Sequence, residues 1–308
     1  MKKNNYNTLS MAYIKIILCV IFFSSSFHTA SFLIKYTDPY SIIFLRFFSA
    51  FLVLLIFNKI FNGVFFNYQI LKKNSFLFLA IGIFGFFFYF LFFLISSERI
   101  PVIIIAIVFA FTPSLSSIAS IIFLKDRLKL LSYVGLIIAL LGTIAIINVK
   151  MSCGRIFCIN FFSQFNSKYS LALLIVFPAV LYNILTKVAS RKGISSTEIV
   201  LNSSIIAAIS ALIFLIINHP IIYKPLISEF WIGIIYFAIP CTALGYILLT
   251  EAIKTLGINK AIIFQNMIPI IAILIETVIY HKKITFLEFC IIGVIIFGII
   301  LTNLPKQS

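Results

Sequence analysis

Two stretches of sequence, 156 residues apart, decide the fold: residues 113–120 read PSLSSIAS and residues 269–276 read PIIAILIE. Each stretch lies inside a long apolar run, and each begins with one of only nine prolines in 308 residues. The same offset relates three further pairs of similar residues: Lys35 and Arg191, Leu128 and Ile284, and Gly142 and Gly298. Several matches in one frame indicate an internal duplication.

The composition indicates an integral membrane protein. Hydrophobic residues make up 62% of the chain and charged residues 10%, and the mean hydropathy is +1.18. A water-soluble domain of this size could not bury so much apolar surface. Ten apolar segments, each long enough to cross a hydrocarbon core of about 30 Å as a helix, occupy residues 13–34, 41–57, 76–95, 102–123, 131–147, 170–188, 199–217, 230–252, 261–280 and 286–304.

The number of segments in each half determines how the halves are oriented. Five helices is an odd number, so the second copy must enter the bilayer from the opposite side. We therefore predict an all-α integral membrane protein whose ten transmembrane helices form two inverted five-helix repeats, residues 11–149 and 170–304, joined by an extracytoplasmic linker at 150–169. Inverted halves around a site near the bilayer midplane are typical of secondary transporters, so transport is the leading hypothesis.

The basic residues follow this topology. The net charge is +16, but the charges are scattered over short loops, which argues against a nucleic-acid partner. With the N-terminus inside, fifteen basic residues fall on the cytoplasmic side and eight outside, while Arg46 lies within a helix. This bias predicts a multi-pass protein of the cell (inner) membrane with both termini in the cytoplasm.

Two local signals place helix starts. Pro39 is expected to open the second helix, because its fixed φ and missing amide donor suit the first turn. Residues 195–198, SSTE, have the spacing of a capping box ahead of the seventh helix.

The five cysteines divide into two groups. Cys153 and Cys158 share the outward linker, where an oxidising compartment would permit a disulfide, with two free thiols as the alternative. Cys19, Cys241 and Cys290 lie in apolar segments and are expected to be small buried hydrophobic residues. No histidine or further cysteine lies near the linker pair in sequence, so we expect no metal site, and no motif predicts a cofactor.

Several motifs resemble those of one family. Residues 39–47, PYSIIFLRF, look like the Arg-Phe pattern in the second helix of the drug/metabolite transporter superfamily, EamA type. Pro113, residues 125–128 (KDRL) and the glycines that follow resemble the fourth-to-fifth helix block of that family, and Pro269 begins a second copy of the block. The resemblance covers residues 14–301 or thereabouts.

The resemblance implies a fold and a cavity. It implies ten helices, cytoplasmic termini and a central cavity lined by helices one to four and six to nine, with helices five and ten serving packing or homodimer contacts. The sequence departs from the family pattern at three positions: Lys282 stands where an acidic residue is usual, Ile291 where Gly135 has its counterpart, and Asn202 where Arg46 has its counterpart.

Polar residues recur along single faces of three predicted helices. An α-helix turns 100° per residue, which places Gln265, Pro269, Ala272 and Glu276 within about 60° of one another. Comparable strips are Pro113, Ser116, Ser117 and Ser120 on the fourth helix and Ser24, His28, Ser31 and Lys35 on the first. Polar strips are costly against lipid, so they should face protein or a water-filled cavity. The predicted substrate-binding or pathway residues are Ser24, His28, Arg46, Pro113, Ser116, Ser120, Asn183, Gln265, Asn266, Pro269 and Glu276.

Each candidate has a structural alternative. Serines often only tighten helix packing, the two prolines can be tolerated kinks, and a histidine such as His28 can be packed rather than a proton carrier. Arg46 could extend to the outer interface or hold an anionic group. Glu276 could relay protons or pair with Lys282 or Lys283. For Glu251 we expect an ion pair at the helix end with Lys254, three residues on.

No enzyme constellation emerges from the sequence: it has no phosphate-binding glycine loop and no zinc-protease motif. We therefore predict a secondary transporter, not an enzyme, that moves a small polar metabolite (an amino acid or related compound) by alternating access. Export is the favoured direction and protons are the candidate coupling ion. An uptake permease of the same fold and a non-transporting membrane scaffold are the alternatives.

Overall fold

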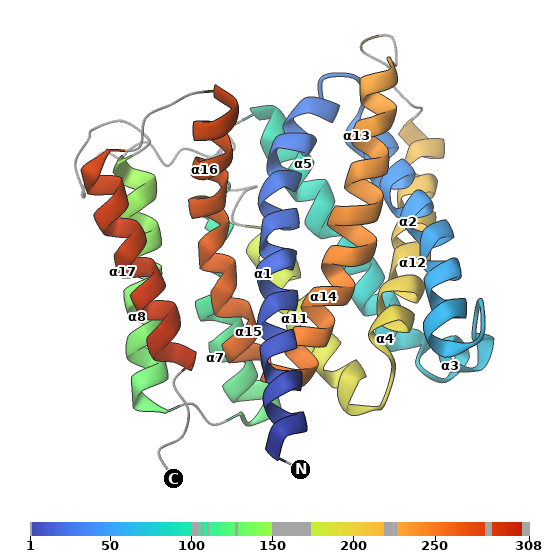
Figure 1. Ribbon diagram of the computed structural model, residues 1–308. Coiled ribbons are helices and arrows are strands. Elements are labelled where there is room, and N and C mark those ends of the chain that lie inside the picture. The colour runs from blue at the N-terminus through green and yellow to red at the C-terminus, as the bar shows by residue number, and fades with distance from the viewer. Residues whose placement is uncertain are drawn as a thin grey trace.

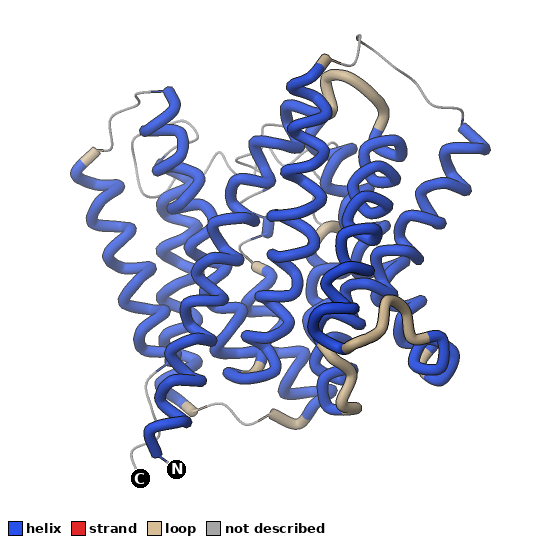
Figure 2. The backbone as a smooth tube through the Cα atoms, turned by 45° about the vertical axis from the view of Figure 1, so that its right-hand side comes forward, coloured by secondary structure: helices blue, strands red, loops and turns tan. Residues whose placement is uncertain are grey.

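The computed structural model describes residues 2–99, 105, 108–109, 111–126, 129–149, 174–218, 224, 227–280 and 285–303. Within these ranges the chain is a bundle of helices without strands (Figures 1 and 2). The elements are α1 (Lys2–Leu33), α2 (Pro39–Asn62), α3 (Tyr68–Lys73), α4 (Ser75–Ala80), η1 (Ile81–Phe88), α5 (Tyr89–Arg99), α7 (Thr112–Leu124), α8 (Leu130–Asn148), α11 (Val176–Arg191), α12 (Ser196–Asn218), α13 (Ser228–Ala238), η4 (Ile239–Leu244), α14 (Gly245–Leu256), α15 (Ile258–Ile262), η5 (Ile263–Met267), α16 (Ile268–Tyr280) and α17 (Phe286–Asn303).

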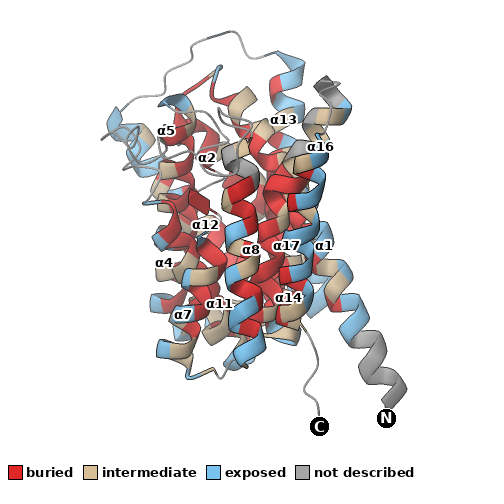
Figure 3. Cartoon of the chain, turned by 90° about the vertical axis from the view of Figure 1, so that its left-hand side faces the viewer, coloured by how far each residue is buried: buried red, intermediate tan, exposed pale blue. Residues whose placement is uncertain are grey.

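Six helices of the described chain are long and apolar enough to cross a membrane: Leu9–Leu33, Pro39–Asn62, Ser75–Arg99, Ser196–Asn218, Ser228–Leu256 and Phe286–Asn303. Three shorter apolar helices accompany them, at Thr112–Leu124, Leu130–Ala145 and Ile258–Ala272. Large apolar side chains such as Phe76, Phe123 and Phe286 lie on the outside, where exposed positions line the bundle (Figure 3). Such a surface suits lipid rather than water, so the predicted all-helical membrane protein is confirmed.

The two predicted helix starts are present. α2 begins at Pro39, and the carboxylate of Asp38 accepts a hydrogen bond from the backbone N–H of Ser41 at 2.9 Å. At the start of α12, the N–H of Ser195 donates to Glu198 Oε2 and the N–H of Glu198 donates to Ser195 Oγ, each at 3.3 Å. This reciprocal pair is the predicted capping box, and it satisfies donors that the first helical turn leaves open.

The two halves deviate from α-helical geometry at the same place. η1, at residues 81–88, and η4, at 239–244, are both π-helical segments within long spans. The 156-residue offset carries residues 81–88 onto 237–244, so η4 falls entirely inside the image of η1. π-helical turns are uncommon and collect at functional sites. The duplication therefore extends to a detail of backbone conformation.

Helices α8 and α17 touch through glycine. A Cβ on Gly142 would lie 2.7 Å from Ile295, and a Cβ on Gly298 would lie 2.6 Å from the backbone nitrogen of Ala139. The offset of 156 converts one contact into the other, because it takes Gly142 to Gly298 and Ala139 to Ile295. Small residues of this kind let membrane helices approach closely. Gly135, earlier in α8 than Gly142, opposes Thr302, later in α17 than Ile295, so the two helices run antiparallel.

The other helix contacts also relate the two halves to each other. α2 packs on α12, α1 packs on α14 and α16, and α11 packs correspondingly on η1 and α7. Tyr40 stacks on Phe214 near the start of α2, while Asn62 at its end bonds to Ser195. α2 and α12 are therefore also antiparallel. α1 begins and α17 ends at the same end of the bundle (Figure 1).

The glycine contact makes a stability prediction. Gly298→Ala should lower the thermal stability of the detergent-purified protein by on the order of 1–3 kcal/mol, because the new methyl group meets backbone that cannot rotate away. Gly293→Ala, on the same helix with no heavy atom within 4 Å of its Cβ position, should leave stability unchanged or slightly raised. Equal melting temperatures for the two variants in a thermal-unfolding assay would contradict the packing described here.

Candidate functional site

A narrow cavity of about 20 Å³, room for about one water molecule, lies in the interior of the bundle. Helices of both halves contribute to its wall, whose residues are Phe23, Gly85, Tyr89, Phe109, Ala179, Tyr182, Asn183, Tyr246, Leu249 and Gln265. Phe109 and Gln265 occupy the same position in the two repeats, as do Phe23 and Ala179. One half therefore supplies rings where the other supplies an amide or a small side chain.

The ring wall is a connected cluster around Tyr246. Its ring centroid lies 4.9 Å from Phe23, 4.7 Å from Phe86 and 5.0 Å from Tyr182, and two of the three pairs are edge-to-face. Such contacts add about 0.5–1.5 kcal/mol each to the burial of the rings. The hydroxyl of Tyr182 also lies 3.1 Å from Thr250 Oγ1, so the cluster holds η1, α11 and α14 in fixed positions.

Three amide side chains lie in or next to the cavity lining: Asn183 and Gln265 line it, and Asn266 follows Gln265 in sequence. Asn183 donates from Nδ2 to Ser116 Oγ at 3.1 Å. Gln265 is buried, and within the described chain its Oε1 has no hydrogen-bond partner. The same is true of both polar atoms of Asn266, which is fully buried. An unpaired buried polar group costs roughly 1–3 kcal/mol, so these amides point to a ligand or water in the interior.

Both amides lie where helix geometry is interrupted. Gln265 and Asn266 belong to η5, a 3-10 segment between α15 and α16, one turn before Pro269. Ser24 on α1 donates to the carbonyl oxygen of Ile268 at 3.0 Å, next to that proline. A 3-10 segment inside a span leaves backbone groups without their α-helical partners, which is tolerated in membranes where protein or a cavity replaces them.

Arg46 is the buried charge behind the cavity. Its side chain is 1% exposed, and its guanidinium lies between the rings of Phe90 and Phe237, with centroids at 3.7 and 3.6 Å. Nε donates to Thr242 Oγ1 at 2.6 Å, whereas Nη1 has no hydrogen-bond partner in the described chain. A charge within a membrane costs about 2.5–3.5 kcal/mol on insertion scales, and desolvated cation–π contacts of about 2 kcal/mol offset part of that cost.

Arg46 is hydrogen-bonded to η4 and lies near two tyrosines of the cavity lining. Thr242, which accepts from Arg46, donates its hydroxyl to the carbonyl of Phe237 at 2.8 Å and so joins the guanidinium to η4. Tyr89 and Tyr246 line the cavity and lie close enough to Arg46 to interact with it electrostatically. The positive charge therefore acts on the cavity from behind a wall of rings.

The structure brings some predicted residues together and separates others. Asn183, Ser116 and Gln265 meet at or beside the cavity. His28 lies half-buried on α1 and Pro113 is buried on α7. Lys35 is exposed beyond the end of α1, apart from the rest of the first-helix strip. The side chain of Glu276 lies outside what the structure describes, although its backbone belongs to α16.

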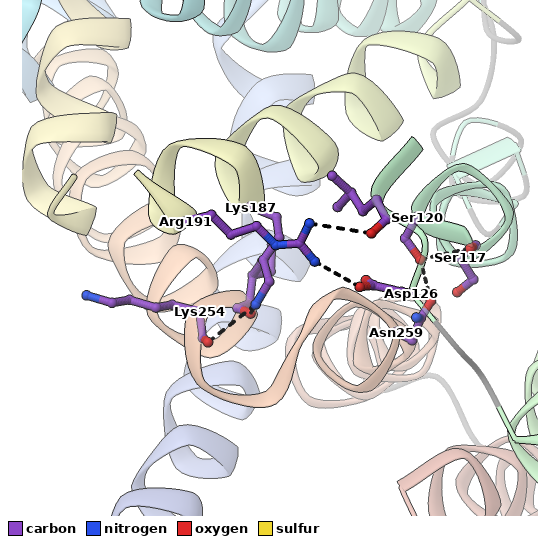
Figure 4. A network of polar contacts seen from close by, with 9 residues as sticks. Ser117, Ser120, Asp126, Lys187, Arg191, Lys254 and Asn259 are labelled. Carbon is purple, nitrogen blue, oxygen red and sulfur yellow. Dashed lines mark hydrogen bonds and ion pairs between the residues drawn. The ribbon is translucent and has the colours of Figure 1, made fainter. Parts of the chain in front are cut away.

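Ser120 belongs to a polar network at the end of the bundle where α1 begins (Figure 4). It bonds to Asn259 Oδ1 at 3.2 Å. Arg191, on α11, forms an ion pair with Asp126 at 3.0 Å, and Lys187 on the same helix donates to the carbonyl of Ile253 at 3.0 Å. The network ties the ends of α7, α11, α14 and α15 together.

Two expectations about side chains are wrong. Glu251 pairs with Lys15 of α1 at 3.4 Å and accepts from Ser196, instead of pairing with Lys254, because tertiary packing brings α1 closer than the helix's own next turn. Cys290 is exposed on the outer face of α17, while Cys19 and Cys241 are buried as expected. Cys153 and Cys158 lie outside the described residues.

The tyrosines and phenylalanines of the cavity were not among the predicted site residues. With 36 phenylalanines and 13 tyrosines, the sequence offers too many rings to single out these few. The repeat offset holds a usable signal, since it takes Gln265, a predicted residue, back to Phe109 and takes Gly245 back to Tyr89. In the described residues, no group of three or more metal-ligating side chains comes together.

Comparison with known proteins agrees with this architecture. The EamA-like transporter family matches residues 10–148 and again residues 166–304. A Bacillus subtilis (strain 168) protein described as "Uncharacterized transporter YyaM" is 25% identical over 271 residues, which is 86% of this chain and 84% of the relative. A crystal structure with 14% sequence identity superposes with a TM-score of 0.73 over 96% of this chain and 97% of its own, and so shares the fold. Because the family matches both halves, this chain belongs to the EamA-like transporter family.

Proposed function

We propose that this protein is a secondary transporter that moves a small polar metabolite, an amino acid or a related compound, across the cell membrane by alternating access. The observation that carries the proposal is the interior cavity, whose lining includes the unpaired amide oxygen of Gln265 and two tyrosines, Tyr89 and Tyr246, that lie near the buried charge of Arg46. A scaffold would have no need to keep this amide oxygen buried and unpaired, whereas a transported solute supplies its partner.

The packing supports a ten-helix architecture of two inverted repeats. Exchanging the halves maps α8 on α17 and α2 on α12, and both pairs run antiparallel. A two-fold axis along the helices would make related helices parallel, so antiparallel pairs favour an axis in the membrane plane. That arrangement places the interior cavity near the bilayer midplane, where transporters of this kind bind substrate.

The chemistry of the cavity favours a substrate with a carboxylate. The guanidinium of Arg46, behind the tyrosines of the wall, makes the interior positive and favours an anionic group in the cavity. The unpaired oxygen of Gln265, which lines the cavity, can accept from an ammonium group. A small amphoteric metabolite would complement both groups.

Alternating access requires that each end of the interior opens in turn. The Asp126–Arg191 pair closes one end and is partly exposed, so it contributes only about 0–1 kcal/mol and can break within a transport cycle. We place this end in the cytoplasm, with both termini, on the strength of the basic-residue bias, in the cell (inner) membrane. We further propose that a proton gradient drives the export of the solute, and that Glu276 is the acid that binds and releases the coupled protons.

A solute panel tests the function directly. The purified protein, reconstituted in vesicles, should exchange labelled amino acids and related carboxylates with and without a pH gradient, and at least one should show saturable flux above protein-free vesicles. Flux indistinguishable from protein-free vesicles across the panel would reject transport of this substrate class.

Arg46 should determine substrate affinity. Arg46→Gln should raise the apparent KM of the transported solute about tenfold, a change of about 1.4 kcal/mol, since it removes the positive charge that attracts an anionic group into the cavity. Lys35→Gln, which removes an exposed cation outside the cavity, is the matched control and should leave KM unchanged. An unchanged KM in a folded Arg46→Gln protein would assign Arg46 a structural role only.

Glu276 should couple flux to protons. Glu276→Gln keeps the shape of the side chain and removes its titration, so gradient-driven flux should be lost while solute exchange at equal pH persists. Flux that still follows the imposed pH gradient in this variant would rule out Glu276 as the coupling acid.

The polar network should control access from the end where α1 begins. In a cysteine-free background, Ala179→Cys places a thiol in the cavity wall. Adding Asp126→Asn should increase its labelling from that side about two- to fivefold, because the lost pair is worth up to about 1 kcal/mol. The charge exchange of Asp126→Arg with Arg191→Asp should restore slow labelling, and Lys72→Gln, at an exposed cation, should have no effect. Labelling unaffected by Asp126→Asn would show that this pair does not close the interior.

A further inference from the structure

A second cavity, of about 490 Å³, lies between α1, the end of α2, the start of α12 and α14. It is separate from the interior cavity: α14 presents Tyr246 and Leu249 to the interior one, and Ile247, Leu248 and Glu251 to this one. The proposed transport function does not use it.

One end of this cavity is charged. Lys15 Nζ lies 3.4 Å from Glu251 Oε2, and Ser196 donates its hydroxyl to the other carboxylate oxygen. The two charged side chains are 34% and 30% exposed, so both remain accessible to a ligand. Lys15 has three N–H donors and Glu251 has several acceptor sites, so the pair retains capacity for additional partners of each sign.

The other end is apolar. Leu244, Ile247, Leu248 and Phe57 form its wall. Glu251 follows Leu244 by seven residues, which separates the charged and apolar ends by about 10 Å along the helix. Ile60 and Phe61, at the end of α2, are 68% and 69% exposed and face outward, where the acyl chains of a bilayer would lie. The cavity thus changes from charged to apolar with depth, as a lipid leaflet does.

This change from a charged to an apolar lining determines which kind of ligand fits the cavity. A water-soluble metabolite would leave the apolar end unused, and an unmodified acyl chain would bury nothing against the charged pair. A ligand that complements the whole cavity carries an anionic and a cationic group at one end and an acyl chain at the other. We propose that the cavity binds an aminophospholipid, with its phosphate on Lys15, its primary ammonium on Glu251 and an acyl chain along Leu244, Ile247 and Leu248.

The test uses the full-length protein, delipidated in detergent, and native mass spectrometry. Titration with phosphatidylethanolamine should give an affinity about tenfold higher than with phosphatidylglycerol of the same chains, because only the former supplies a partner for Glu251. Free phosphoethanolamine should not bind measurably. Equal affinities for the two lipids, or binding of the free headgroup alone, would overturn the proposal in favour of an unselective lipid contact or a polar metabolite site.

Two variants distinguish the contribution of the lipid headgroup to binding from that of the acyl chain. The double change Lys15→Met with Glu251→Gln should abolish the preference between the two lipids. Leu248→Trp, which fills the apolar end and leaves the charged pair in place, should weaken the binding of both by about tenfold or more. Glu229→Gln, at an exposed acid on α13, is the control and should change neither. A preference that survives the double change in a folded protein would refute the assignment, and so would undiminished binding to Leu248→Trp.

Discussion

Every polar group inside this bundle must find its partner in protein, because the surrounding lipid offers none. That constraint explains most of what the interior looks like. Serine and threonine hydroxyls bond to carbonyls of their own helix one turn earlier, as Ser117 does to Pro113 and Thr143 does to Ala139. The charge of Arg46 is enclosed by two rings and a hydroxyl. Some buried groups of the described chain lack such a partner, among them Thr112, Thr186 and the amides of η5. Of these, Gln265 lines the interior cavity, which makes it a candidate for contact with a solute.

Duplication and divergence have separate roles in the fold. Features that hold the bundle together recur in both halves: the π-helical turns, the two prolines and the reciprocal glycine contacts of α8 and α17. Features of the cavity differ between the halves, as Phe109 against Gln265 and Phe23 against Ala179 show. A symmetric cavity would have presented the same group from both sides. Divergence at a few wall positions gave the interior both aromatic rings and amide groups.

The sequence was sufficient to predict that the chain forms apolar helices. It was insufficient to predict which side chains bond to each other across those helices. Hydropathy and the capping box of α12 are local signals, and the six long apolar helices of the described chain overlap segments that they predict. The partners of buried groups depend on how helices meet, which no local pattern records. Arg46 bonds to Thr242, 196 residues away, and Glu251 pairs with Lys15 on another helix rather than with its neighbour Lys254. Sequence spacing favoured Lys254 as the partner of Glu251, but the packing of α14 against α1 brings Lys15 to it instead.

The contact between α8 and α17 bears on how such a chain could arise. Gly142 meets Ile295 in the same way that Gly298 meets Ala139, so each half carries both surfaces of the joint. A chain of half this length, with the same residues, would already hold the two surfaces needed to join a second copy of itself. Fusing two such genes would add covalent continuity without requiring a new interface, and would leave each copy free to change its own cavity wall.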